Sequence, residues 1–116
     1  MSISKELLSE ALKCKVHHIN IEVHESTVVY HTVNPRYKDY PQPKTINIHE
    51  LMHLCKEWAY EQGYILTQAK RKASIRQYRI SIHTKEHYQK EKCFLEHSEP
   101  EACFLACEWI LENKDN

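Results

Sequence analysis

The sequence predicts an α+β fold in which helices cover an antiparallel sheet, with the element order α-β-β-α-β-β-(β)-α. Two kinds of hydrophobic pattern support this prediction. Residues 48–62 carry apolar side chains at helical spacing, whereas residues 16–24 and 75–83 alternate apolar and polar side chains as half-buried strands do. With 116 residues, the chain is expected to form one domain with its own hydrophobic core.

The first elements expected are a helix over Lys5–Lys13 and two strands over Val16–His24 and Thr27–Val33. Ser4 suits the N-cap of the helix, because its hydroxyl can accept a hydrogen bond from a backbone N–H of the first turn. Only Glu25-Ser26 separates the two strands, so they are expected to form a hairpin.

The helix over Ile48–Gln62 has a capping residue at each end. Asn47 can accept a hydrogen bond at the N-terminus, and Glu50, three residues later, would complete a capping box. Gly63 is the only glycine in the chain and follows the helix, where a left-handed backbone conformation is common. The glycine therefore has a conformational explanation and requires no ligand.

The rest of the chain is expected to hold three further strands and a long buried helix. These elements are Tyr64–Thr67, Ile75–His83, Lys92–Glu96 and Glu99–Glu112. The last helix is apolar around most of its circumference, which indicates burial on several sides. Trp58 and Trp109 each lie in an apolar stripe, so both are expected to be largely buried.

Residues 49–53 spell H-E-x-x-H, the zinc signature of the zincin metallopeptidases. On a helix, His49 and His53 could bind one Zn²⁺, and Glu50 could act as general base on a zinc-bound water. In a chain with nine histidines the pentapeptide can also arise by chance, and the capping box gives Glu50 a structural role. The possible third ligands, none at a characteristic spacing, are His83, His87, His97 and the downstream glutamates. We therefore predict no metal and no cofactor, with a zinc-dependent hydrolase as the alternative.

Residues 34–45 are expected to form a loop, because three prolines interrupt regular structure there. The loop mixes cations with aromatic side chains, a combination that can anchor a protein partner or stack on nucleic-acid bases. The candidate partner-binding residues in the loop are Arg36, Tyr37, Lys38 and Tyr40. The alternative is that its tyrosines pack against the domain.

Residues 70–79 contain five cations and no anions, and the candidate contacts there are Lys70, Arg71 and Lys72. The helix–strand–strand–strand–helix order of the second half is similar to that of double-stranded-RNA-binding domains. Those domains place lysines where this chain has Glu99-Pro100-Glu101. We therefore favour contact between the basic segment and the acidic last helix, and keep an RNA-binding module as a second alternative.

Other histidines and two cysteines offer further candidate metal or redox sites. Four histidines lie on or beside the first hairpin, where opposed strand positions could pair two of them as metal ligands: His17, His18, His24 and His31. A polar sheet face is the alternative interpretation. Cys103 and Cys107, four residues apart, could bind a metal or form a redox pair, but their apolar neighbours favour a place in the core.

Composition excludes several classes of function. Sixteen basic and sixteen acidic residues give no net charge with the histidines neutral, so no overall field favours nucleic acid or an anionic membrane. There is no leader-like segment and no apolar run long enough for a membrane span. Five cysteines, an odd number, fit reduced thiols. These features predict a cytoplasmic protein without a membrane partner.

Two segments resemble the small phage ABA-sandwich domains. Cys55-Lys56-Glu57-Trp58 corresponds to their tryptophan-bearing central helix, and Pro100-Glu101-Ala102 with Ala106-Cys107 corresponds to their alanine-rich closing helix. The resemblance implies a phage or prophage origin, and the family has no established activity to carry over. We predict a small non-enzymatic binding or accessory protein of phage, prophage or bacterial origin, whose partner the sequence does not identify.

Overall fold

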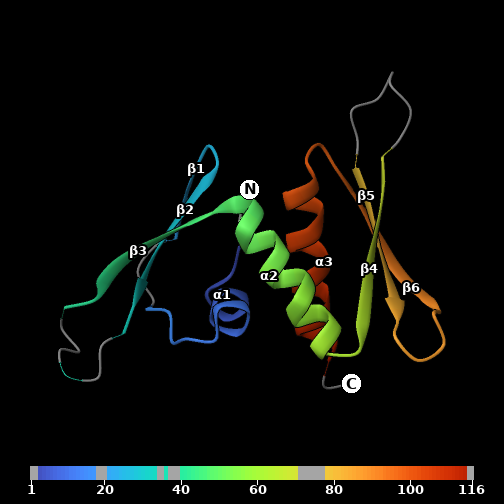
Figure 1. Ribbon diagram of the computed structural model, residues 1–116, viewed down its shortest axis with the longest axis horizontal. Coiled ribbons are helices and arrows are strands. Elements are labelled where there is room, and N and C mark those ends of the chain that lie inside the picture. Colours follow the sequence, from blue (N-terminus) through green and yellow to red (C-terminus); the bar gives the residue numbers. More distant parts are fainter. Residues whose placement is uncertain (1–2, 18–20, 34–35, 37–39, 71–77, 115–116) are drawn as a thin grey trace.

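The computed structural model describes residues 3–17, 21–33, 36, 40–70 and 78–114. Within these residues the element order is α-β-β-β-α-β-β-β-α, which confirms the α+β class (Figure 1). The elements are α1 Lys5–Leu12, β1 Glu22–His24, β2 Thr27–Thr32, β3 Gln42–Asn47, α2 Ile48–Glu61, β4 Tyr64–Lys70, β5 Tyr78–Thr84, β6 Lys90–Glu96 and α3 Glu99–Asn113.

The strands divide into two three-stranded antiparallel sheets, with strand orders β1-β2-β3 and β4-β5-β6. The three helices lie between the sheets, with β1–β3 on the left of Figure 1 and β4–β6 on the right. The chain therefore repeats an α-β-β-β unit and closes with α3. Each sheet turns one face toward the helices and leaves the other face outward.

The sequence placed two boundaries in the first half incorrectly. Of the strand predicted over Val16–His24, residues 18–20 lie outside the described part of the chain, and among the others Val16 bridges to Thr32 and Glu22–His24 form β1. Residues 42–45, predicted as loop, belong to β3. Pro43 is compatible with this assignment because β3 is an edge strand, where a missing N–H can face solvent.

The second half follows its prediction more closely. Gly63 has a φ of +96° at the end of α2, as expected for a left-handed C-terminal residue. β4 continues to Lys70, three residues beyond the predicted strand. The predicted strand over Ile75–His83 corresponds to β5, and its residues 75–77 lie outside the described part of the chain.

α3 is the most enclosed element, because it contacts α2 on one side and the inner face of β5 and β6 on the other. Seven of its fifteen residues are buried: Pro100, Ala102, Cys103, Phe104, Ala106, Cys107 and Ile110. Across the interface, β5 contributes Ile80 and Ile82, both fully buried. Trp58 on α2 is 2 % exposed, as predicted. Trp109 is only half-buried and meets Tyr64 edge-on, with ring centroids 6.2 Å apart.

Among the described helices, none combines the length and the apolarity needed to cross a membrane.

Candidate functional site

The three polar residues of the zinc signature, His49, Glu50 and His53, lie on the first two turns of α2, and their side chains are exposed to solvent. The Asn47 side chain caps this helix by accepting a hydrogen bond from the His49 backbone N–H at 2.9 Å. The second bond of the predicted capping box, from Asn47 N–H to Glu50, is not formed between these two described residues. His53 Nε2 lies 3.1 Å from Glu57 Oε1, and both side chains are mostly exposed.

No group of three or more His, Cys, Asp or Glu side chains is placed to hold a metal within the described residues. His83, a possible third ligand, instead lies on β5, where its Nε2 is 3.1 Å from Thr67 Oγ1 and its ring stacks on Tyr88. His17 and His31 do lie opposite each other, and the His17 N–H donates to the His31 carbonyl at 2.7 Å. His18 lies outside the described residues, and among those described no third His, Cys, Asp or Glu side chain joins His17 and His31 to form a metal site.

The cysteines of α3 belong to the core. Cys107 donates to the Cys55 carbonyl across the α2–α3 interface with 3.6 Å between sulfur and oxygen, and Cys55, Cys103 and Cys107 are all fully buried. Hydrogen bonding with the thiols of Cys103 and Cys55, together with burial, raises the pKa of Cys107 well above its usual range. A thiol in this state is protonated and unreactive at neutral pH.

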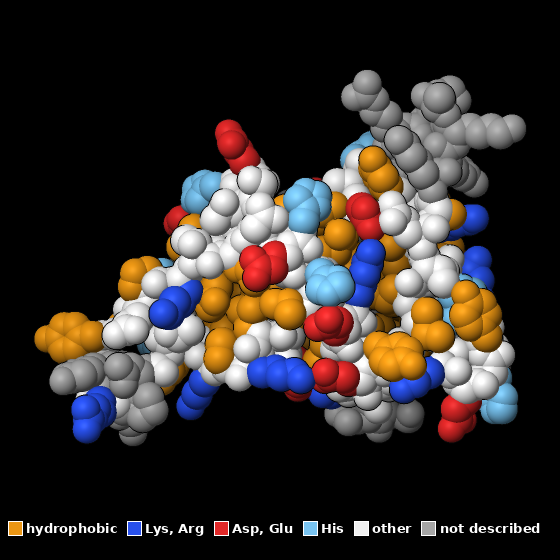
Figure 2. All heavy atoms as spheres, in the orientation of Figure 1, with side chains coloured by type: hydrophobic (Ala, Val, Ile, Leu, Met, Phe, Trp, Pro, Cys, Tyr) orange, Lys and Arg blue, Asp and Glu red, His pale blue; other side chains and the backbone are white. Residues whose placement is uncertain are grey.

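The structure describes only part of the two basic segments. In the loop before β3, Arg36 and Tyr40 are exposed, Tyr40 at 75 %, while Tyr37 and Lys38 lie outside the described residues. Lys70 ends β4, and Arg71 and Lys72 lie outside the described residues. Positive and negative side chains are interspersed over the face shown in Figure 2.

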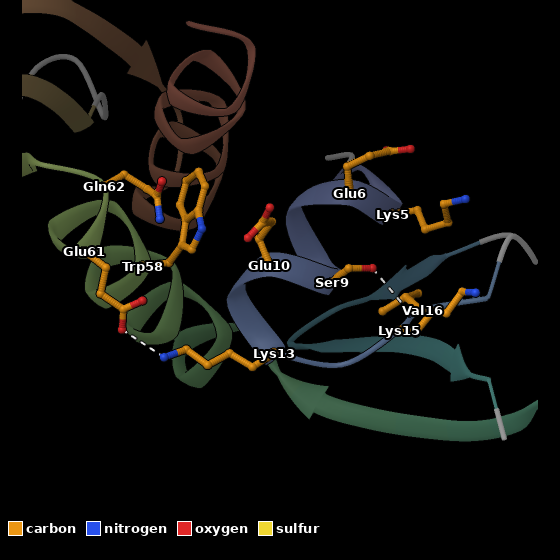
Figure 3. Close-up of a pocket in the computed structure, with 10 residues that line it drawn as sticks. All are labelled: Lys5, Glu6, Ser9, Glu10, Lys13, Lys15, Val16, Trp58, Glu61 and Gln62. Carbon is orange, nitrogen blue, oxygen red and sulfur yellow. Dashed lines mark hydrogen bonds and ion pairs between the residues drawn. The ribbon is translucent and has the colours of Figure 1, made fainter. Parts of the chain in front are cut away.

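A groove of about 510 Å³ runs between α1 and α2 and reaches the chain segment after α1 (Figure 3). Its walls are formed by Lys5, Glu6, Ser9, Glu10, Lys13, Lys15, Val16, Trp58, Glu61 and Gln62. This volume lies in the range of about 300–1,000 Å³ typical of small-ligand sites. The groove exists because α1 is only eight residues long and ends at Lys13 in a left-handed conformation, so the chain turns away before it covers α2.

Trp58 supplies an unsatisfied donor at this groove. Its Nε1 has less than 1 Å² of exposed surface and no hydrogen-bond partner. Figure 3 shows the nitrogen edge of the indole turned toward Glu10 on α1. A buried donor without a partner costs about 1–3 kcal/mol, so an acceptor brought to this nitrogen would recover free energy.

The charges of the groove are partly paired within the protein. Lys13 Nζ lies 3.0 Å from Glu61 Oε1, which joins the two walls, and Lys114 Nζ lies 3.1 Å from Glu10 Oε1. Within the described residues Lys5 and Lys15 form no ion pair; Figure 3 places them at the end of the groove away from Trp58.

In comparisons with known proteins, no family model, curated protein or solved structure matches the chain. The resemblance to ABA-sandwich domains therefore stays a prediction, and any function has to be proposed from the residues themselves.

No pattern in the sequence indicates this groove. The apolar stripe of α2 predicts that Trp58 is buried, but it gives no role to Lys5, Glu10 or Lys15. The indole N–H of Trp58 was the one available signal. A buried tryptophan usually donates this N–H to an acceptor, and the sequence of α2 does not indicate which group would accept it. The position of α1 against α2, which forms the groove, depends on tertiary packing that periodicity does not encode.

Proposed function

We propose that this protein is a non-enzymatic binding protein and that the groove between α1 and α2 holds its ligand. The observation that supports the proposal is the buried, unpartnered N–H of Trp58 at the groove. Protein interiors rarely leave such a donor unpaired, and an unpaired one is a reason to look for a ligand or an ordered water. Glu10 and Gln62 are long side chains at the groove wall that can move to admit an acceptor.

The test uses the indole resonance of Trp58 as reporter. In ¹⁵N-labelled Trp109→Phe protein, Trp58 is the only tryptophan. We expect at least one of a panel of acceptor-bearing probes to shift its Nε1–H signal saturably. The panel contains glucose, inorganic phosphate, acetate, N-acetyl-triglycine and N-acetyl-triglycine amide.

The matched control for the donor is Trp58→Phe, which keeps an aromatic ring and removes the N–H. In the otherwise unchanged protein, the thermal stabilisation given by a binding probe should disappear in this variant. An indole signal that responds to none of the five probes would contradict the proposal. A signal that moves in Glu10→Ala without any probe would show that the protein's own carboxylate fills the acceptor position.

A further inference from the structure

We infer that the ligand of the α1–α2 groove is the C-terminal end of a peptide chain, bound through its terminal carboxylate and a preceding backbone carbonyl. This inference rests on the proposed function of the groove. Its basis is the order of donors along the groove and the charge that remains after internal pairing.

Three kinds of donor follow one another between α2 and the segment after α1. The Trp58 N–H lies at one end. In the middle, Ser9 Oγ accepts from the Val16 N–H at 3.2 Å and keeps its own hydroxyl hydrogen for a ligand. At the far end, Lys5 and Lys15 offer ammonium groups. A peptide presents acceptors in the matching order, with backbone carbonyls first and a carboxylate last.

The net charge of the groove favours a single negative charge. The Lys13–Glu61 and Lys114–Glu10 pairs cancel internally. Among the lining residues this leaves Lys5 and Lys15 against Glu6, a balance of one positive charge. A carboxylate matches that balance, whereas the second charge of a phosphate dianion would find no unpaired lysine left in the lining to balance it.

The experiment compares N-acetyl-triglycine with its amide, which differs only in the terminal charge. In the labelled Trp109→Phe protein, we expect the acid to shift the Trp58 indole resonance saturably and the amide to bind at least fivefold more weakly. Acetate and inorganic phosphate, which carry the charge without backbone carbonyls, should leave the resonance in place. Added salt should reduce the difference between acid and amide, because exposed charges are screened.

A double substitution locates the carboxylate. Lys5→Gln with Lys15→Gln should lower the affinity for the acid to that for the amide and leave the amide unaffected. The matched control is Lys90→Gln with Lys92→Gln, two exposed lysines on β6 in the other sheet, which should change neither affinity.

The results that would contradict the inference can be told apart, because each one refutes a different part of it. Equal binding of acid and amide would refute the carboxylate and leave the groove as a binding site. A shift with acetate or phosphate equal to that with the acid would make the groove an anion site and refute the peptide. If no probe moves the resonance, the proposed function itself fails.

Discussion

The two α-β-β-β units of the molecule share strand order and direction but differ in how completely helices cover their sheets. In β1–β3 only Val28 and Tyr30 are buried, and most of β3 is exposed. In β4–β6 the fifteen-residue α3 covers the sheet, and three consecutive residues of β5 are buried. One hydrophobic core runs through both halves, and the difference teaches that the closing helix, more than the strand arrangement, decides which sheet is covered more completely.

The less covered half is also where the groove lies. α1 has eight residues against fifteen in α3, and the groove lies between α1 and α2, beside the buried N–H of Trp58. The well-covered half is therefore expected to give most of the stability, and the other half the binding surface.

The largest expected effect is a loss of core packing in the covered half. Phe104→Ala on α3 removes a side chain that is 1 % exposed and should lower the free energy of unfolding by about 3–5 kcal/mol. The neighbouring Leu105 is 39 % exposed, so Leu105→Ala is a matched control with an expected change within about 0.5 kcal/mol. Urea unfolding measures both. Similar losses would show that α3 is not packed as described.

Alkaline pH should destabilise both halves, the covered one first. Folding raises the pKa values of Cys107 and Tyr30. The causes for Cys107 are those described above, and for Tyr30 they are burial first and then the nearby Cys14 and Glu50. Such groups ionise more readily in the unfolded chain, so their stabilising contribution is complete at neutral pH and declines as pH rises. The decline should begin near pH 9 for Cys107 and near pH 10 for Tyr30.

Two substitutions separate these contributions. Cys107→Ala should flatten the fall in stability from about pH 9, and Tyr30→Phe should flatten only the part above about pH 10. A free energy of unfolding of the wild-type protein that rises with pH over this range would contradict the raised pKa values of both groups.

A smaller effect is expected at the contact that joins the two halves. Ser4 caps α1 by accepting from the Leu7 N–H, and its own hydroxyl donates to Glu108 Oε1 on α3 at 2.7 Å. Ser98 caps α3 by accepting from the Glu101 N–H, and its side chain has no comparable second contact within the described residues. Ser98→Ala should therefore cost about 1 kcal/mol and Ser4→Ala about 2 kcal/mol or more. Thermal unfolding measures both losses, and equal losses of stability in the two variants would show that the contact between Ser4 and Glu108 adds no stability.

The smallest effect is expected at the H-E-x-x-H residues. Asn47→Ala removes the α2 cap and should cost about 1 kcal/mol. Glu50→Gln should change stability by less than about 0.5 kcal/mol, because Glu50 is exposed and does not complete the capping box. Elemental analysis should find no stoichiometric zinc. One equivalent of zinc that is lost in both His49→Ala and His53→Ala would restore the hydrolase alternative.

Local patterns predicted the helices well and the strands less well. The ends of the helices were predictable at Ser4, Asn47 and Gly63. Helix capping and a positive φ depend on residues that are near in the sequence, so a local pattern can reveal them. β3 was missed because Pro43 normally argues against a strand, and only its place at a sheet edge makes it acceptable. The division into two sheets also depends on long-range pairing, which alternation alone does not specify.

Of the candidate sites, the sequence correctly placed His49 and His53 on a helix and Cys103 and Cys107 in the core. It could not indicate that Lys15, in the segment after α1, shares a groove with Trp58. Residues more than forty positions apart meet there through the packing of α1 on α2, so no local pattern records the contact.

Native-state amide hydrogen exchange tests the contrast between the two halves most directly. The amides of Ile80 and Ile82 on β5 are expected to exchange only through global unfolding, with the full free energy of unfolding. Those of Val28 and Tyr30 on β2 should exchange through a smaller opening, with a lower free energy and weaker denaturant dependence. Equal free energies at all four amides would contradict the account, because both sheets would then unfold as one cooperative unit.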